Sequence, residues 1–343
     1  MARNTFRNFS TYKIDPLTEI RNAGIVTNGE VYWVSSVSDS DHTERTGNLG
    51  RTAVKTTLQA AIDQTEDNGN DYILVIPTDG GTVRPLTEGV NVNKGRVHIL
   101  GVGAGPAPMG DNGYTFRGFA TTSTVDTELL NVSAEGVELG GVKFVGTSTT
   151  SANGSILEIV QIGTAASGTP HGLWMHDVHF EETSAAADNG TVNIINISGN
   201  VAGGILGMRF DRIWAGNFSF APAAVVAMAG TAGPTRPVFT NSTFVINAQA
   251  TSDDFVVMGT GVMQYTLFDN CEFINVNAGT APASALTGAI LAGNPTHLRN
   301  CTYLNVTQGG TDTEAYKSPV ASGTSAVIRD YGIAVGTAAL TPV

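Results

Sequence analysis

Short apolar runs alternate with polar stretches along the C-terminal two-thirds of the chain, and one four-residue motif recurs among them. Each motif ends in an aromatic residue, and most begin with Asn or Asp. The six tetrads are Gly141-Val-Lys-Phe144, Asp177-Val-His-Phe180, Asp211-Arg-Ile-Trp214, Asn241-Ser-Thr-Phe244, Asn270-Cys-Glu-Phe273 and Asn300-Cys-Thr-Tyr303. The steps between the aromatic residues are 36, 34, 30, 29 and 30 residues. A period of this size predicts stacked supersecondary units.

A second apolar run lies upstream of each later tetrad. These runs are residues 156–160, 192–197, 224–228, 255–258 and 289–292. We therefore expect each unit to hold at least two strands and one polar loop of variable length. Loops such as 147–155, 183–190 and 276–285 would absorb the irregular spacing between units.

The tetrads predict a ladder of like side chains on successive units. Asn and Asp tolerate the left-handed backbone of a bend, and alternate residues of a strand point to the same face. We expect a buried polar ladder and an inward aromatic stack from the same tetrads. The expected ladder residues are Asp177, Asp211, Asn241, Asn270, Asn300, Phe144, Phe180, Trp214, Phe244, Phe273 and Tyr303. In the third tetrad Arg212 would take an inward position, so either the register shifts there or Arg212 leaves the stack.

The N-terminal part predicts strands around one short helix. Residues 31–34, 71–77 and 97–101 are apolar enough for strands. Val54, Leu58, Ala61 and Ile62 fall on one face of a helix, for which Thr52 is the expected N-cap.

This order resembles the start of the pectate-lyase-like β-helix proteins. The similarity rests on a strand, a polar loop, the segment Thr56-Thr-Leu-Gln-Ala-Ala-Ile-Asp63 and the strand Asp71-Tyr-Ile-Leu-Val-Ile-Pro77. The resemblance implies an all-β fold, a right-handed single-stranded parallel β-helix (β-solenoid) with a short N-terminal capping helix. That superfamily includes lyases, hydrolases, adhesins and phage tailspikes, so the resemblance specifies the fold and not the activity.

We divide the chain into four parts. Residues 1–30 are expected to be an N-terminal arm or attachment segment, and 31–96 the first strands with the capping helix. Residues 97–320 would form the coils of the parallel β-helix, and 321–343 a C-terminal coil or an exchanged strand.

Composition and charge limit the classes of partner that the chain is expected to bind. Charged residues are 14% of the chain and the net charge is −12, which argues against nucleic-acid binding. No stretch approaches ~18 apolar residues, so we expect no membrane span. The first residues lack the apolar segment of a signal peptide, so we expect synthesis in the host cytoplasm. Cys271 and Cys301 fall at equivalent positions of adjacent units; a disulfide is conceivable, and two thiols in an apolar stack are favoured.

Candidate chemistry is sparse. The segment Gly101-Val-Gly-Ala-Gly105 is followed by prolines rather than a helix, so no dinucleotide cofactor is expected. His171, His176 and His179 cluster in sequence, but His176 and His179 should face opposite sides of an extended segment, so no metal site is assigned.

Catalytic residues are likewise not assigned. Glu181, Glu182, Asp211, Asp253 and Asp254 suggest a carboxylate groove, yet no Asp cluster on successive units has Lys or Arg beside it. Asp177 and Asp211 align with the polar ladder, which favours a structural role, and the ligand-binding residues stay unknown.

The leading functional hypothesis is a structural virion protein of a tailed bacteriophage. It would be a capsid decoration, fibre or tailspike-like component, exposed on the virion surface, with binding of a host glycan as a further expectation. We expect a homotrimer that contacts other virion proteins through its N-terminal segment and uses no cofactor. A polysaccharide lyase or hydrolase is the first alternative, so enzymatic activity stays open although a non-enzymatic role is favoured. A cell-surface adhesin or filament subunit is the second alternative.

Overall fold

The computed structural model describes most of the repeating strands and the turns that join them. The described residues are 29–35, 53–76, 84–86, 89–102, 118–121, 128–146, 158–163, 170–182, 193–198, 205–218, 224–229, 234–248, 254–258, 266–277, 286–288, 297–304 and 329–330. Of the expected arm at 1–30 they include Gly29 and Glu30, and of the tract 321–343 one short strand.

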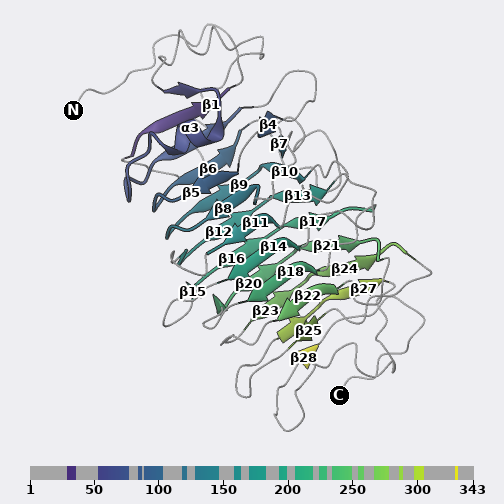
Figure 1. Cartoon of the computed structure of the whole chain (residues 1–343). Coiled ribbons are helices and arrows are strands. Elements are labelled where there is room, and N and C mark those ends of the chain that lie inside the picture. The colour runs from purple at the N-terminus through teal and green to yellow at the C-terminus, as the bar shows by residue number, and fades with distance from the viewer. Residues whose placement is uncertain are drawn as a thin grey trace, which may run out of the picture.

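The described strands form three long parallel sheets and one short one (Figure 1). Sheet A contains, in spatial order, β2 (Val54–Lys55), β1 (Val31–Val34), β3 (Tyr72–Val75), β6 (His98–Gly101), β9 (Glu138–Gly140), β12 (Trp174–His176), β16 (Arg209–Asp211), β20 (Val238–Thr240), β23 (Leu267–Asp269), β26 (His297–Arg299) and β28 (Arg329–Asp330). Sheet B contains β27 (Thr302–Leu304), β24 (Glu272–Asn275), β21 (Thr243–Ile246), β17 (Trp214–Gly216), β13 (His179–Glu182), β10 (Lys143–Gly146), β7 (Gly118–Thr121) and β4 (Arg84–Leu86). Sheet C contains β25 (Leu286–Gly288), β22 (Asp254–Met258), β18 (Ala224–Ala229), β14 (Asn193–Ser198), β11 (Glu158–Ile162), β8 (Leu130–Val132) and β5 (Val90–Val92). The short sheet pairs β15 (Ile205–Leu206) with β19 (Pro234–Thr235).

From β3 onward the chain visits sheets A, B and C in turn, and each strand pairs with the equivalent strands of the preceding and following coils. Figure 1 shows the coils stacked along one axis, from the first strands at the top to β28 at the bottom. The predicted parallel β-helix is therefore confirmed. Each complete coil places one strand in each of the three long sheets, and two coils add a strand of the short sheet, so the minimum of two that the apolar runs required is exceeded.

Two left-handed corners bound sheet A. The corner that leads from sheet A to sheet B has positive φ at Gly141 (65°), Asp177 (54°), Arg212 (51°), Asn241 (50°), Asn270 (55°) and Asn300 (54°). The corner that leads into sheet A has positive φ at Arg96 (55°), Gly136 (65°), Gly172 (67°), Gly207 (72°) and Arg236 (58°). From Gly136 to Gly141 is five residues, and the same step separates the two corners in the next three coils. The four strands between these corners, β9, β12, β16 and β20, therefore have three residues each, which aligns their side chains in rows.

The third tetrad corrects the predicted register. Arg212, and not Asp211, occupies the left-handed corner, while Asp211 is the last residue of β16. Trp214 pairs with His179, and Ala215 pairs with Phe180. The predicted ladder positions of Asp211 and Trp214 are therefore wrong. The physical reason is that apolar Ile213 fills the inward position after the corner, so the inward partner of Phe180 is Ala215 and Trp214 points outward.

The polar ladder lies on the outside of the corner rather than in the core. Asn241, Asn270 and Asn300 are exposed. Asn270 Nδ2 donates to Asn241 Oδ1 at 2.8 Å, and Asn300 Nδ2 donates to Asp269 Oδ1 at 3.3 Å. The expectation of a buried amide ladder is wrong, because these positions are set by the left-handed backbone, which Asn adopts at little cost.

Aromatic side chains form three stacked rows in the core. Phe119, Phe144 and Phe180 stack on sheet B with ring centroids 5.6 and 5.9 Å apart, and further along that sheet Phe244 stacks on Phe273 at 5.2 Å. On sheet A, Phe210, Phe239 and Phe268 stack at 4.3 and 4.7 Å, a row that the tetrads did not reveal. All of these rings are buried. Tyr303 pairs with Phe273 in the backbone register, and its side chain lies outside the described residues.

A short helix packs beside the first coils. Helix α3 spans Leu58–Ile62, and Thr57 is its N-cap, whose hydroxyl accepts from the Ala60 N–H at 3.1 Å. Leu58, Ala61 and Ile62 are buried in the main core. Thr52 is therefore not the cap, and Val54 lies on β2, where it pairs with Trp33. No helix among the described residues has the length and apolarity needed to span a membrane.

The two cysteines carry thiols that lie inside the stack, one coil apart. Both side chains are fully buried, and Glu272 and Thr302, which follow them, are register partners. Each Sγ lies near the carbonyl oxygen two residues earlier, at 3.6 Å for Cys271 and 3.4 Å for Cys301. Burial raises the pKa of the Cys271 thiol well above its ordinary value. The structure thus has the favoured thiols rather than a disulfide.

Both thiols should therefore resist modification in the folded protein. We expect a water-soluble aromatic disulfide reagent at pH 8 to react with neither thiol before unfolding and with both in concentrated denaturant, because only the exposed thiolate is a nucleophile. Fast reaction of one thiol in the native protein would contradict the buried register of these coils.

Candidate functional site

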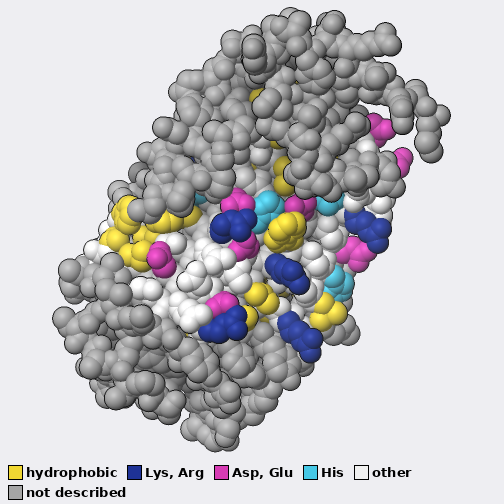
Figure 2. All heavy atoms as spheres, turned by 180° about the vertical axis from the view of Figure 1, so that it is seen from behind, with side chains coloured by type: hydrophobic (Ala, Val, Ile, Leu, Met, Phe, Trp, Pro, Cys, Tyr) yellow, Lys and Arg dark blue, Asp and Glu magenta, His cyan; other side chains and the backbone are white. Residues whose placement is uncertain are grey.

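The outer face of sheet A aligns several of the described ionic side chains in two rows. The first row runs through His98, Glu138, Trp174, Arg209, Val238 and Leu267. The second row runs through Leu100, Gly140, His176, Asp211, Thr240, Asp269 and Arg299. We call this surface, with its two left-handed corners, the sheet A face. Figure 2 shows one band of the surface where basic, acidic, histidine and hydrophobic side chains lie interspersed.

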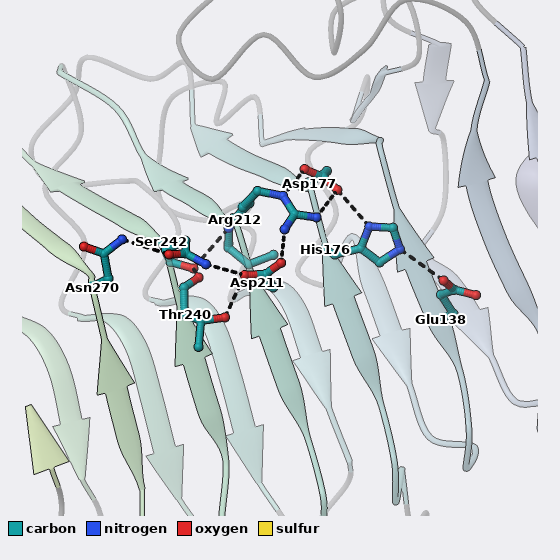
Figure 3. Close-up of polar contacts among 10 residues, drawn as sticks. Glu138, His176, Asp177, Asp211, Arg212, Thr240, Ser242 and Asn270 are labelled. Atoms are coloured by element: carbon teal, nitrogen blue, oxygen red, sulfur yellow. Dashed lines mark hydrogen bonds and ion pairs between the residues drawn. The ribbon is translucent and has the colours of Figure 1, made fainter. Parts of the chain in front are cut away.

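A continuous series of ionic contacts crosses four coils on this face, and Figure 3 shows it from Glu138 onward. His98 Nδ1 lies 2.5 Å from Glu138 Oε2, and His176 Nε2 lies 3.1 Å from Glu138 Oε1. His176 Nδ1 lies 2.9 Å from Asp177 Oδ2. Arg212 then donates to both Asp177 oxygens, at 2.6 and 2.8 Å, and also to Asp211.

The series continues through neutral groups on the next coils. Thr240 Oγ1 donates to Asp211 Oδ1 at 2.7 Å, and Asn241 Nδ2 donates to the same oxygen at 2.9 Å. Asn270 then donates to Asn241, as described above. We call the whole set, from His98 to Asn270, the coil-bridging row. Every link in it joins groups on adjacent coils or on neighbouring residues, so the row ties the coils together along the outside.

Gly140 makes the central link possible. A Cβ atom at this position would lie 2.4 Å from Cε1 and 2.6 Å from Nε2 of His176. The imidazole ring therefore occupies the space that any other residue would fill. Because Gly140 is the register partner of His176 on the preceding coil, its missing side chain lets the ring reach back to Glu138.

Paired charges hold these groups in their ionised forms. Burial alone raises the pKa of Glu138, but hydrogen bonds from His176 and His98 outweigh it and lower that pKa to about 2. Burial alone lowers the pKa of His176, whereas its contacts with Asp177 and Glu138 raise it to about 9. For Asp177, contacts with Arg212 and His176 overcome burial and hold the pKa of the carboxyl well below its usual range. At neutral pH Glu138 and Asp177 are therefore carboxylates and His176 is a cation, and neither carboxyl group carries a proton for general acid catalysis.

The row predicts a loss of stability at alkaline pH. The pKa of His176 is raised from 6.5 to about 9 on folding, so its stabilising contribution is complete below pH 6.5 and disappears as pH rises through 9. We expect the free energy of unfolding to fall by about 3 kcal/mol between pH 6.5 and 9.5, since each pH unit between the two pKa values corresponds to about 1.4 kcal/mol. Denaturant unfolding at both pH values would measure it.

The matched variant for this pH effect is His176→Gln, which should unfold more easily at pH 6.5 and lose most of the slope. An unchanged slope in that variant would show that other groups titrate in this range. Glu138 acts at the opposite end of the scale, because its lowered pKa makes its contribution complete above pH 4.5 and lost as pH falls toward 2.

The carboxylates expected to form a groove are not brought together. Asp211 lies on sheet A, Glu181 on sheet B and Asp254 on sheet C. Glu181 instead contacts the buried Lys143 at 2.5 Å and His179 at 3.2 Å. Asp253 and the side chain of Glu182 lie outside the described residues.

The three histidines are also separated in the fold. His171 lies beside the corner that leads into sheet A, His176 is on β12 and His179 is on β13 of sheet B. Among the described residues no group of three His, Cys, Asp or Glu side chains is arranged to hold a metal ion.

A second polar row, on the outer face of sheet C, was not predicted. Asn196 Nδ2 donates to Gln161 Oε1 at 2.8 Å, and Gln161 Nε2 donates to Ser198 Oγ at 2.6 Å. In the sequence, Gln161 and Asn196 each stand between two apolar residues of a strand, and that alternation is the signal that could have indicated an outward polar row.

Three parallel sheets, short left-handed corners and stacked side chains are the architecture of a parallel β-helix. No protein-family model matches the sequence, and no curated protein matches it either.

Solved structures match the fold. A pectin methylesterase in complex with a hexasaccharide superposes with a TM-score of 0.50 at 11% identity, over 92% of this chain and 92% of that chain. Tailspike protein 2 from Escherichia coli O157:H7 bacteriophage CAB120 gives 0.39 at 9% identity, over 80% of this chain and 36% of that one. The ORF18 protein of Geobacillus virus E2 gives 0.37 at 10% identity, over 96% of this chain and 66% of that one. At such low identities the first likeness establishes the parallel β-helix fold and nothing finer.

Proposed function

We propose that this chain is a structural component of a tailed-phage particle, exposed at the particle surface, where it contacts host polysaccharide. The observation that carries the proposal is the coil-bridging row. Its charged side chains are matched by neighbours on adjacent coils, so they brace the solenoid from outside while the phenylalanine rows brace it from inside.

Such bracing suits a scaffold more than a catalyst. A catalytic carboxyl group needs a pKa close to the working pH. The pKa of Glu138 is about 2, and the pKa of Asp177 is held below its usual range. Both carboxylates therefore stay ionised in their ion pairs. Breaking a pair of this kind leaves a charge without its partner, which opposes local opening of the coils.

The proposal also includes an oligomeric state and a segment for attachment. A homotrimer would place three solenoids side by side, and the segment 1–30 would attach them to other virion proteins. The acidic net charge of −12 would keep the assembly soluble outside the cell.

Two measurements on the full chain test this proposal. Light scattering coupled to gel filtration should give three times the mass of one chain, and antibody against the chain should label purified phage particles in electron micrographs. A monomer, together with particles that bind no antibody, would overturn the proposal.

A polysaccharide hydrolase or lyase is the second candidate, because an exposed aromatic side chain adjoins the ionic groups. Trp174 is 43% exposed and lies beside His176, with ring centroids 4.4 Å apart. Incubation with a panel of bacterial and algal polysaccharides would produce new reducing or unsaturated ends if the chain is an enzyme. Trp174→Ala should then lower the activity, whereas Phe218→Ala, which removes another exposed aromatic side chain, should leave it unchanged.

A further inference from the structure

One open patch on the sheet A face combines an exposed indole with an exposed guanidinium. Trp174 and Arg209 are register partners on β12 and β16, so their backbones lie about 4.8 Å apart and their side chains leave the sheet side by side. Both are exposed, and Arg209 forms no ion pair within the described part of the chain. One side of the indole is held by His176, at an angle of 36° between the rings.

The corner next to this pair has glycine, which has no side chain, at two adjacent coils. Gly172 and Gly207 stand two residues before Trp174 and Arg209, and a Cβ atom at Gly172 would meet nothing within 4 Å. The side chain of Leu206, which precedes Gly207, is 48% exposed. A ring-shaped ligand can therefore approach the indole from the corner without meeting a side chain at either glycine.

The patch itself carries a positive charge although the whole chain is acidic. Arg209 is exposed beside the corner that leads into sheet A, and the exposed Glu135 lies two coils away at the same corner. Glu138, the nearest carboxylate in the row of Trp174, is already held between two histidines. The field that a ligand meets at Arg209 therefore favours an anion.

We propose that Trp174 and Arg209 form a subsite for an acidic saccharide, with the pyranose ring against the indole and the carboxylate or phosphate of the sugar on the guanidinium. Aromatic rings supply rigid apolar contact, and guanidinium groups bind planar anions through paired N–H donors. This subsite gives the proposed polysaccharide contact a place and a charge. Binding is measured on purified protein, so its failure leaves the proposed place on the particle standing.

Other ligand classes fit the patch less well. An extended peptide would need an open strand edge, and β12 is paired on both sides, with β9 and β16. A nucleic acid would bring many phosphates against a chain of net charge −12, while the patch offers one guanidinium group.

Calorimetric titration of the full chain tests the subsite. The probes are alginate oligosaccharides, which carry carboxylates, glycerol teichoic acid, which carries phosphates, and neutral dextran of similar length. We expect at least one acidic probe to bind and dextran to bind more weakly. Trp174→Ala should weaken acidic-probe binding about 10-fold, and Arg209→Gln about 3- to 5-fold. Added salt should weaken the wild type more than Arg209→Gln.

Two variants control for general surface effects. Phe218→Ala removes an aromatic side chain that is 55% exposed, and Arg299→Gln removes an exposed guanidinium that pairs with Asp269. Both should bind like the wild type. Full binding by Trp174→Ala, equal binding of dextran, or no binding of either acidic probe at about 1 mM would overturn the subsite. The probe that binds distinguishes carboxylate from phosphate as the recognised group.

Discussion

Replacement of Phe239 by alanine should lower the free energy of unfolding by about 3–5 kcal/mol, the range measured for large aromatic side chains removed from a core. Phe239 is fully buried and stacks between Phe210 and Phe268, with ring centroids 4.3 and 4.7 Å apart. Its ring also meets the edge of Phe244 at 6.0 Å. The variant would thus open a cavity in the middle of a stack of three rings.

Thermal unfolding followed by circular dichroism measures this effect. Phe218→Ala is the matched control, since Phe218 is exposed and its removal should change stability by no more than about 0.5 kcal/mol. If Phe239→Ala melted like Phe218→Ala, the interior aromatic row on sheet A would be wrong.

Gly216→Ala should be nearly as damaging, at about 2–5 kcal/mol, because backbone strain and collision act together. Gly216 has φ of +106°, and a Cβ atom there would lie 1.8 Å from the carbonyl oxygen of Val245 on the next coil. That carbonyl belongs to β21, the register partner of β17, so the collision would push two strands of sheet B apart.

The control for Gly216 separates the two causes. Gly172 also has positive φ, +67°, but a Cβ atom there would meet nothing within 4 Å. Gly172→Ala should therefore cost only the left-handed conformation, about 1–2 kcal/mol. Chemical denaturation of both variants gives the comparison, and equal losses would mean that collision contributes nothing at Gly216.

The sequence was sufficient for the fold and for one of the two corners. The recurrence of Asn or Asp before an aromatic residue reveals a periodic bend, because few residues adopt the left-handed conformation and proteins place them where it is needed. The third tetrad does not follow this pattern, because Arg212 occupies the corner there and arginine does not indicate a left-handed bend. The second corner was missed for the same reason, since glycine alternates there with Arg96 and Arg236.

The coil-bridging row could not be derived without the register. His98, Glu138 and His176 are about 40 residues apart in sequence, and the loops between them vary in length. Which residues face each other across coils depends on where each strand of sheet A begins. The five-residue step between the two corners supplies that information. The tetrads indicate only one of these corners, so they do not reveal the step.

The sequence also gave no correct indication of the roles of Asp211 and Gly140. Asp211 was expected in the corner ladder, but it accepts from Thr240, Asn241 and Arg212 as the end of a strand. Gly140 gave no signal at all in the sequence, although its missing side chain is what admits the ring of His176. Such a role is set by a neighbour 36 residues away, which no local pattern reveals.

The constant distance between the two corners also determines how this molecule can change in length. One residue added to or removed from a strand of sheet A would reverse the faces of every later residue in that strand. A whole coil carries no such penalty, because Cys271, Glu272 and Phe273 repeat the places of Ser242, Thr243 and Phe244. Excision of residues 242–270 would join Asn241 to Cys271 with both corners intact, shortening the solenoid by about 4.8 Å. The length of the solenoid can therefore change in steps of one coil.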